Sequence, residues 1–277
     1  MSVDEGTAVV KQPLVDLTGR HVVITGGAGG VGQALADVFA AANARISLLD
    51  LAGADTKEVA ARITDAGGSA GARDCDVSDP AQVTEAFAWA ESAFGRPDIL
   101  VNNAGINKRG PSLEITGAEW DHTFAVNLKG YFQCAQEFGR RLVDAGQPGS
   151  VVMVSSIGGV TSLGRGNFSY GVTKAGVNQL TRELAVVWGP HGIRVNAVAP
   201  CQIATEGLKE LSQRPSEEGH LLNTFLRGIP LGRLVEPSEV AAAVAFLASG
   251  AASMITGVVL PVDGGNLALN AGGTIGD

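Results

Sequence analysis

Tyr170 and Lys174 are candidate catalytic residues because of their types and their spacing. They occur in the segment YGVTK, and residues four apart lie on one face of a helix. A free tyrosine has a pKa near ~10 and is a weak base at neutral pH, whereas a neighbouring ammonium favours the phenolate. The pair predicts a group that exchanges a proton with an alcohol or a carbonyl. The plain alternative is that a tyrosine and a lysine stand one turn apart by chance.

A glycine-rich segment follows the first strand-like run of the sequence. After HVVIT (21–25) comes GGAGGVG, so that Gly26, Gly29, Gly30, Val31 and Gly32 lie between a strand pattern and a helix pattern. Such a turn lets the backbone approach a pyrophosphate, whose charge is stabilised by the free N–H groups of the helix N-terminus. Because strand, helix and a following acid occur in the expected order, we favour a dinucleotide site over a plain tight turn.

Asp50 ends the next strand-like run, ARISLLD (44–50). It stands about 20 residues after the glycine turn, where a carboxylate accepts hydrogen bonds from the adenosine ribose hydroxyls. A carboxylate there would repel a 2′-phosphate, and Leu51 and Ala52 offer no compensating positive charge. We therefore predict NAD rather than NADP, with a solvated acid at a strand end as the plain alternative. Hydride transfer needs a general acid or base beside the substrate oxygen, so the two predicted sites support each other.

The elements that would position these residues alternate along the chain. The predicted strands are 21–25, 44–50, 97–103, 150–156, 193–200 and 257–263, and the predicted helices are 31–42, 54–66, 80–94, 118–145, 170–188 and 237–249. Continuous apolar strands between helices are typical of a parallel sheet covered on both faces. We predict an α/β fold: a single-domain, Rossmann-like, doubly wound parallel sheet with helices on both faces.

Three segments accompany this alternation. Residues 1–16 lack the apolar segment of a secretory signal and are predicted to be a mobile N-terminal arm. Residues 17–265 form the dinucleotide-binding and catalytic domain, within which about 201–236 interrupts the pattern and offers leucines for a substrate lid. Residues 266–277 are a C-terminal tail.

The composition of the chain restricts the classes of partner that it could bind. The 20 Lys and Arg against 28 Asp and Glu give a net charge of -8, which would repel nucleic acid and an anionic membrane surface. Apolar runs are broken well before the ~20 residues that a membrane span needs. The three cysteines are far apart and the histidines form no zinc motif, so neither disulfides nor a metal site is predicted. We expect a cytoplasmic protein that binds a small-molecule substrate.

Eight motifs in a fixed order carry a resemblance to a known family. They are TGGAGGVG (25–32), DCDV (74–77), NNAG (102–105), VNLKG (126–130), SS (155–156), YGVTK (170–174), RVNAVAP (194–200) and PVDGG (261–265). With them, the chain from Leu17 to Gly265 resembles the short-chain dehydrogenase/reductase family, and in particular its NAD-dependent polyol and sugar dehydrogenases.

The resemblance implies a role for each catalytic residue. Tyr170 would be the acid/base, and Lys174 would hold the nicotinamide ribose and lower the tyrosine pKa. Ser156 would hydrogen-bond the substrate oxygen, and Asn127 would position a water that links the lysine to solvent.

Further cofactor contacts also follow from the resemblance. Asp76 and Val77 would flank the adenine, and Asn103, Ala104 and Gly105 would line the cofactor cleft. Contacts at the end of the 193–200 strand and just after it are predicted at Pro200, Ile203 and Thr205. NADP-preferring members often carry a basic residue where this chain has Gly29, which agrees with NAD.

Two features depart from the usual family pattern. Ser156 stands 14 residues before Tyr170, one more than usual, so the intervening loop carries an extra residue. Strand-end placement favours Ser156 over Ser155, whose side chain should point to the opposite face of the sheet. Cys201 replaces the usual glycine after the proline, and we predict a packed thiol there rather than a reactive one.

In this family the substrate pocket is built from loops that here span 106–111, 157–169 and 201–236. The substrate candidates on them are Asn107, Arg109, Arg165, Asn167 and Gln202. A polar set favours a polyol, sugar or sugar acid over a steroid or long acyl chain, because hydroxyls left unpaired in a dry pocket are costly. Either arginine would fit a carboxylate, or would simply lie on the surface.

The leading prediction is an NAD-dependent oxidoreductase of carbohydrate metabolism that interconverts a secondary alcohol and a ketone. A 3-oxoacyl-thioester reductase is the alternative enzyme, and a catalytically silent NAD-binding sensor is the alternative from another class. The resemblance also implies a homotetramer, with the helices 118–145 and 170–188 at an interface. Their apolar positions would otherwise belong to the core.

Overall fold

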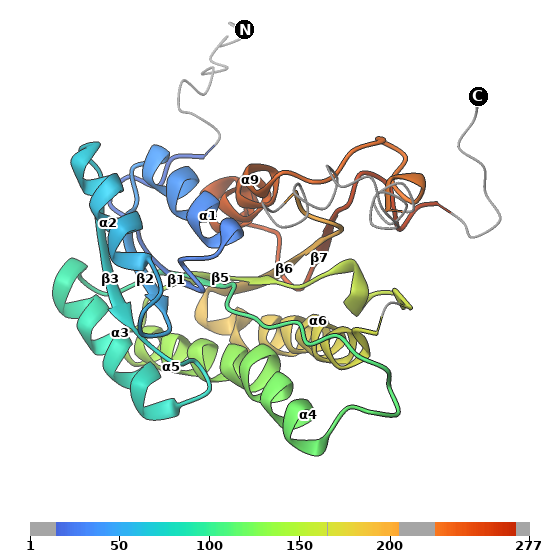
Figure 1. Cartoon of the computed structure of the whole chain (residues 1–277). Coiled ribbons are helices and arrows are strands. Elements are labelled where there is room, and N and C mark those ends of the chain that lie inside the picture. The colour runs from blue at the N-terminus through green and yellow to red at the C-terminus, as the bar shows by residue number, and fades with distance from the viewer. Residues whose placement is uncertain (1–14, 165, 205–224, 270–277) are drawn as a thin grey trace, which may run out of the picture.

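The computed structural model describes residues 15–164, 166–204 and 225–269 of the 277-residue chain. Its centre is a seven-stranded sheet in the order β3-β2-β1-β4-β5-β6-β7, in which every neighbouring pair is parallel (Figure 1). The strands are β1 (His21–Thr25), β2 (Arg45–Asp50), β3 (Ser69–Asp74), β4 (Ile99–Asn102), β5 (Gly149–Val154), β6 (Ile193–Pro200) and β7 (Val259–Val262). This sheet confirms the predicted doubly wound α/β class.

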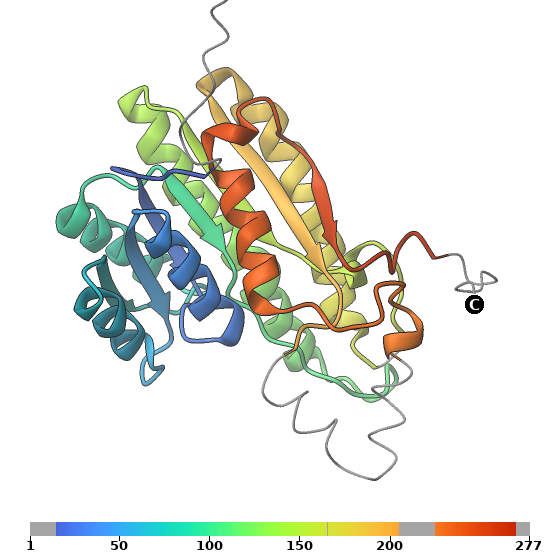
Figure 2. The same cartoon turned by 90° about the horizontal axis from the view of Figure 1, so that it is seen from above.

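Helices cover both faces of the sheet. The main helices are α1 (Gly30–Ala41), α2 (Thr56–Asp65), α3 (Pro80–Phe94), α4 (Gly117–Phe124), α5 (Gly130–Ala145), α6 (Phe168–Trp188) and α9 (Pro237–Ala248). Figure 1 and Figure 2 show α1, α2 and α9 on one face and α3, α5 and α6 on the other, with α4 leading into α5. Short 3-10 turns are η2 (Ile157–Gly159), η3 (Gly189–His191) and η4 (Gly250–Ala252).

Two apolar cores hold these layers together, because successive strand residues point to opposite faces of the sheet. In β1, Val22 and Ile24 belong to the same core as Leu35 and Phe39 of α1, whereas Val23 belongs to the core on the other face. All five side chains are fully buried. Each such side chain stabilises the fold by about 1.5–3 kcal/mol, so the strand pattern fixes both layers at once.

Two elements differ from the sequence predictions. β3, with the sequence SAGARD, carries small and charged residues and no apolar run, so its pattern does not indicate a strand. It forms at the sheet edge because it needs to pair on one side only, with β2. The helix expected over 118–145 contains a π-helical segment, η1 (Ala125–Lys129), between α4 and α5. Such segments occur frequently at functional sites.

The carboxyl ends of the strands provide the place for a site. From β1 the sheet extends in one direction through β2 and β3 and in the other through β4 to β7. Loops that leave β1 and β4 therefore diverge and open a crevice at this edge. Thr25, Asp50, Asn102 and Val154 end their strands there.

Several predicted segments fall wholly or largely outside the described residues. These are the N-terminal arm up to residue 14, residues 205–224 of the predicted lid, and the tail from residue 270. Within the described ranges, no helix has the length and apolar character needed to cross a membrane.

Candidate active site

The glycine turn after β1 forms a cradle of backbone at the start of α1. Gly26 has a φ of 67°, in the left-handed region, and a Cβ there would lie 2.7 Å from the Cα of Ala104. A Cβ at Gly32 would collide with the carbonyl oxygen of Gly26, whereas Gly29 and Gly30 have room around them. No side chain caps the N-terminus of α1, and its first turn holds no acidic residue. Its free N–H groups are therefore available to an anion.

A cleft of about 570 Å³ runs along this cradle and contains Asp50. The Asp50 carboxylate accepts hydrogen bonds from the N–H groups of Ala28, at 2.9 Å, and Leu51, at 2.8 Å. Most of the other predicted cofactor residues line the same cleft: Gly26, Gly29, Gly30, Val31, Gly32, Leu51, Asp76, Val77, Asn103, Ala104 and Gly105. Its volume is in the range of a small-molecule site.

The cleft also contains residues that sequence reasoning missed. His122 of α4 and Val126 of the π-helical segment line it. Thr25 connects the end of β1 to the chain after β4, because its Oγ1 accepts hydrogen bonds from the N–H groups of Asn103, at 3.0 Å, and Ala104, at 3.1 Å. The position of Thr25, directly before the glycine turn, is the signal that could have revealed it.

Asn127 lies fully buried in the π-helical segment and anchors the chain that follows β4. Its side-chain amide donates to the carbonyl of Ile106 at 2.8 Å, and its Oδ1 accepts from the N–H of Ile106 at 2.9 Å. A longer contact of 3.4 Å joins the amide to the Thr173 hydroxyl of α6. Asn127 thereby connects Ile106, which lines the cleft, to the helix that carries Tyr170.

Tyr170 and Lys174 lie one turn apart at the start of α6, as the sequence predicts. The Ser156 side chain, just beyond β5, accepts a hydrogen bond from the N–H of Gly158 at 3.0 Å and lies close enough to the Tyr170 phenol to lower its pKa. The hydroxyl of Ser155 points elsewhere and lies 2.6 Å from Oδ1 of Asn178. The structure thus pairs Tyr170 with Ser156 and not with Ser155.

The Lys174 ammonium is almost completely buried beside this pair. Its Nζ donates to the hydroxyl of Tyr131 at 2.9 Å and to the carbonyl of Val154 at 2.8 Å, and lies 5.5 Å from the centroid of the Tyr170 ring. Burial lowers the pKa of Lys174 to about 7. Burial also raises the pKa of Tyr170, a shift that the nearby Ser156 side chain opposes. The expected lowering of the Tyr170 pKa is not seen here, because desolvation dominates at the phenol and the ammonium bonds to other groups.

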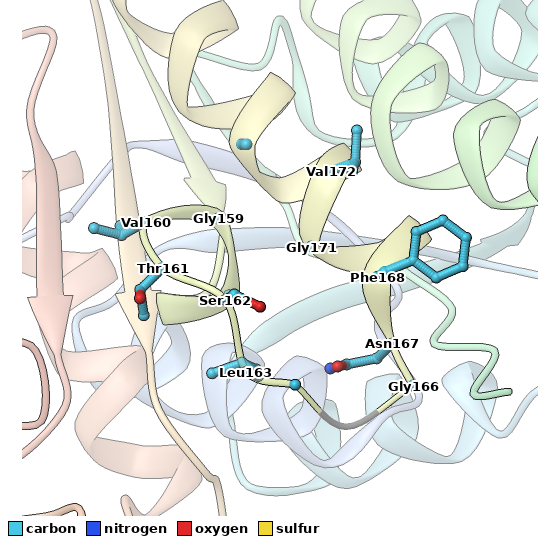
Figure 3. Close-up of a pocket in the computed structure, with 13 residues that line it drawn as sticks. Gly159, Val160, Thr161, Ser162, Leu163, Gly166, Asn167, Phe168, Gly171 and Val172 are labelled. Carbon is cyan, nitrogen blue, oxygen red and sulfur yellow. The ribbon is translucent and has the colours of Figure 1, made fainter. Parts of the chain in front are cut away.

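The loop after Ser156 and the start of α6 enclose a separate cavity of about 380 Å³ (Figure 3). Glycines and apolar side chains form most of its lining, and the predicted substrate residue Asn167 is among the polar ones. Figure 3 shows the Asn167 side chain extending toward Leu163 across this space. Neither Ser156 nor Tyr170 lines this cavity, which is therefore separate from the predicted catalytic residues.

The remaining substrate candidates are dispersed. Asn107 and Arg109 are exposed on the loop after β4. A backbone hydrogen bond of 2.8 Å, from the N–H of Gly110 to the carbonyl of Gly166, joins this loop to the one before α6. Gln202, after β6, has a buried Oε1 without a hydrogen-bond partner among the described residues. Arg165 lies outside the described residues.

Five predicted cofactor residues are not among those that line the cleft. Tyr170 and Lys174 lie in the cluster at the start of α6. Pro200 is buried at the end of β6, and Ile203 forms an isolated β-bridge with Val235. Thr205 lies outside the described residues.

Comparison with known proteins decides the family. The family model described as Enoyl-(Acyl carrier protein) reductase matches residues 26–266. The chain is 42% identical over 252 residues to galactitol 2-dehydrogenase (L-tagatose-forming) of Cereibacter sphaeroides, covering 90% of this chain and 95% of that protein. The chain belongs to the short-chain dehydrogenase/reductase family.

Two other short-chain dehydrogenases cover the chain to a similar extent. D-threitol dehydrogenase of Mycolicibacterium smegmatis is 38% identical over 252 residues, 90% of this chain and 93% of that protein. The solved structure of a gluconate 5-dehydrogenase from Burkholderia cenocepacia, in complex with NADP and tartrate, has a TM-score of 0.85 at 32% identity and covers 92% of this chain and 98% of that chain.

The structure describes both departures from the usual short-chain dehydrogenase pattern. Cys201 is buried in the apolar core, and burial, followed by the charge of Asp263, raises its pKa to about 11. A thiol that stays protonated at neutral pH is a packed residue. With the extra residue between them, Ser156 still lies close enough to Tyr170 to lower the pKa of its phenol.

Proposed function

We propose that this short-chain dehydrogenase interconverts a secondary alcohol and a ketone on a small polyol, sugar or sugar acid, with NAD as cofactor. The observation that carries the proposal is the cluster of Ser156, Tyr170 and Lys174, with Nζ of Lys174 5.5 Å from the Tyr170 ring centroid, at the sheet edge that also holds the cleft of the glycine turn. A group that exchanges protons at this edge is what hydride transfer to or from an alcohol carbon requires.

The residues around the reacting oxygen have separable tasks. Ser156 and Tyr170 both present hydroxyls, so two hydrogen bonds orient the substrate oxygen. Tyr170 accepts the alcohol proton during oxidation and returns it during reduction. Lys174 holds a positive charge near the phenolate and lowers its energy. When bound, the nicotinamide accepts or supplies the hydride.

The cleft residues fit a dinucleotide, and two features support NAD over NADP. The open backbone at Gly29 and Gly30, with the uncapped start of α1, would hold the pyrophosphate. Asp50 would hold the adenosine ribose, and its charge opposes a 2′-phosphate. No lysine or arginine lines the cleft in the part of the chain that is described.

The substrate class is supported by the relatives and by the loops around the cluster. The similar proteins carry names that refer to galactitol, threitol and gluconate, all polyhydroxylated. Asn107, Arg109, Asn167 and Gln202 supply polar groups near this edge that suit several hydroxyls better than a long acyl chain.

One observation favours a second candidate. The description of the matching family model names an acyl-carrier-protein reductase. The same arrangement of Ser, Tyr and Lys also serves the reduction of a 3-oxoacyl thioester. Asp50 weighs against it, since biosynthetic reduction usually draws on NADPH.

The test measures initial rates by nicotinamide absorbance, with NAD and NADP in parallel, on galactitol, threitol, gluconate and a hydroxyacyl thioester. We expect NAD-dependent oxidation of a polyol or sugar acid. Tyr170→Phe should lower kcat at least 100-fold while NAD binding is retained, because it removes the proton acceptor and leaves the cleft. Ser156→Ala should also lower kcat, whereas the matched variant Ser155→Ala should retain the chemistry.

Other results would assign the chain differently. Turnover of the thioester alone would favour the acyl reductase. Binding of NAD without turnover of any class would favour a silent sensor, and a preference for NADP would overturn the role given to Asp50.

We also propose that the chain is a cytoplasmic homotetramer in which α5 and α6 face partner subunits. Large apolar side chains are exposed on α6, at Val172, Val186 and Val187, with Val186 at 78%. All three cysteines are unpaired, which suits a reducing compartment. A light-scattering mass of four chains is the expected result, and a monomer would contradict the assembly.

A further inference from the structure

Tyr131 is a buried side chain beside Lys174 to which the proposed reaction gives no task. It lies on α5, four residues after Asn127, and is 1% exposed. Its hydroxyl accepts a hydrogen bond from Nζ of Lys174 at 2.9 Å and donates one to the carbonyl of Val154 at 2.9 Å. The same carbonyl accepts from Nζ at 2.8 Å, so the three groups form a closed triangle.

The donors and acceptors of this triangle are matched. An ammonium has three N–H donors, of which Tyr131 and Val154 take two. Since the phenol proton is directed to Val154, the phenol oxygen turns its lone pairs to the ammonium. A phenylalanine at 131 would fill the same space but leave the buried ammonium one acceptor short.

No carboxylate compensates for that loss among the described residues, since burial is what shifts the pKa of Lys174. The titratable side chains that face the contact are Tyr170 from α6 and, behind Tyr131, the thiol of Cys134 on α5, with Cys75 after β3 beyond it. Burial raises the pKa of both thiols, so they stay uncharged at neutral pH. The charge state of Lys174 therefore depends on neutral hydrogen-bond acceptors.

We propose that Tyr131 is a positioning residue for Lys174, whose hydroxyl holds the ammonium in place and in its charged form within reach of Tyr170. The catalytic consequence rests on the proposed function, whereas the hydrogen bond and its effect on Lys174 do not. Tyr131→Phe isolates the hydroxyl, because it keeps the ring that lies 4.6 Å from Nζ.

The first experiment titrates Lys174 directly, by NMR of protein labelled with carbon-13 at the lysine Cε. Tyr131→Phe should lower the pKa of Lys174 by about one unit, a tenfold loss of the charged form relative to the neutral one. The matched control is Thr181→Val, which removes a buried hydroxyl from α6, the helix of Lys174, and should leave this pKa unchanged. An unchanged Lys174 pKa in Tyr131→Phe would overturn the proposal.

The second experiment compares the pH profiles of kcat/KM for alcohol oxidation. In the active form Lys174 is charged and Tyr170 is ionised, and this form carries the same number of protons as neutral lysine with neutral tyrosine. Tyr131→Phe shifts that balance, so its rate should fall about tenfold above pH ~7 and approach the parent rate below pH ~6. A uniform loss at every pH would indicate a merely structural residue and contradict the proposal.

Two precautions keep the outcome decisive. If no substrate is turned over, the proposed function fails while the NMR titration still tests Tyr131. If Tyr131→Phe does not fold, fluorotyrosine labelling of the parent chain replaces it, since the sequence has two tyrosines and Tyr170→Phe assigns their signals. The fluorine chemical shift of Tyr131 should change with pH at the pKa of Lys174. A chemical shift that stays constant through that titration would contradict the proposed hydrogen bond.

Discussion

Asp50 is the residue on which the proposed preference for NAD depends. Its oxygens already accept hydrogen bonds from Ala28 and Leu51, which hold the charge at the rim of the cleft. Asp50→Asn keeps the size and removes the charge, so the 2′-phosphate of NADP is no longer repelled and the ribose hydroxyls of NAD lose a strong acceptor. We expect the ratio of kcat/KM for NAD to that for NADP to fall at least about tenfold, measured with one substrate and both cofactors.

Asp74 provides the matched control for this prediction. It pairs in register with Asp50 on the neighbouring strand, yet it lines a different pocket, with Lys57 and Trp89. Asp74→Asn changes the net charge equally and should leave the cofactor ratio unchanged. Equal effects of the two variants would attribute the preference to overall charge, and an unchanged ratio in Asp50→Asn would remove Asp50 from cofactor choice.

Single residues were predictable where a motif or a periodicity constrained them. Strand alternation was enough to choose Ser156 over Ser155, and helical spacing was enough to place Tyr170 beside Lys174. Tyr131 was not predicted, because its proposed role depends on a contact between α5 and α6 that the sequence does not reveal. A single buried tyrosine on a helix is otherwise indistinguishable from an ordinary core residue. Its position one turn after Asn127 was the available signal.

At the scale of elements, the turn from β1 into α1 must pack closely against itself and, in the proposed function, also bind the dinucleotide. Gly32 packs so tightly that a Cβ would meet the carbonyl oxygen of Gly26, which is backbone and cannot move aside cheaply. Gly32→Ala should therefore displace the turn, weaken dinucleotide binding at least about tenfold and destabilise the fold by about 1–3 kcal/mol. Calorimetric titration with NAD and urea denaturation measure the two effects.

Gly30, two residues earlier, separates this steric effect from the loss of glycine itself. A Cβ at Gly30 meets nothing within 4 Å, and the residue begins α1. Gly30→Ala should keep or slightly raise stability, because alanine is the better helix former. Should Gly32→Ala bind NAD as tightly as the parent chain, close packing would not be what makes the glycine necessary.

Elements were predictable in proportion to their apolar pattern. The strands with continuous apolar runs were found within a few residues, because burial on both faces selects such runs. β3 was not, since an edge strand is stabilised by pairing with β2 more than by its own side chains. The π-helical segment at Asn127 is a change of hydrogen-bond register, which side-chain periodicity does not record.

For the whole molecule, the decisive property is the strand order, which brings distant motifs to one edge. Thr25, Asp50, Asn102 and Val154 are far apart in sequence but end neighbouring strands of one sheet. A parallel sheet made their common edge predictable. The substrate loops were less so, because Asn107, Arg109 and Asn167 are placed by loop contacts such as the bond from Gly110 to Gly166 rather than by a repeating pattern.

The same sheet contains a buried histidine that links global stability to pH. His21 of β1 is fully buried; its Nδ1 lies 2.7 Å from the carbonyl of Gly95 and must donate to it, so Nε2 accepts from Ser47 at 2.9 Å. Burial is the largest cause that lowers the pKa of His21, to about 4. The native fold therefore contains neutral His21 at pH values where an unfolded chain would bind a proton.

This difference predicts how the free energy of unfolding changes with pH. Below the unfolded pKa of about 6.5, the unfolded state gains a proton that the native state does not, so stability falls by about 1.4 kcal/mol per pH unit as pH drops toward 4. Above that pKa the contribution is complete and the curve is flat. Urea denaturation between pH 7.5 and 5.5, run on the parent chain and on His21→Gln, measures it. The stability advantage of the parent should shrink by about 1.4 kcal/mol over this whole range, with about 1 kcal/mol of the loss below pH 6.5. A constant difference between the two proteins would show that His21 is protonated equally in both states, contrary to its burial between Gly95 and Ser47.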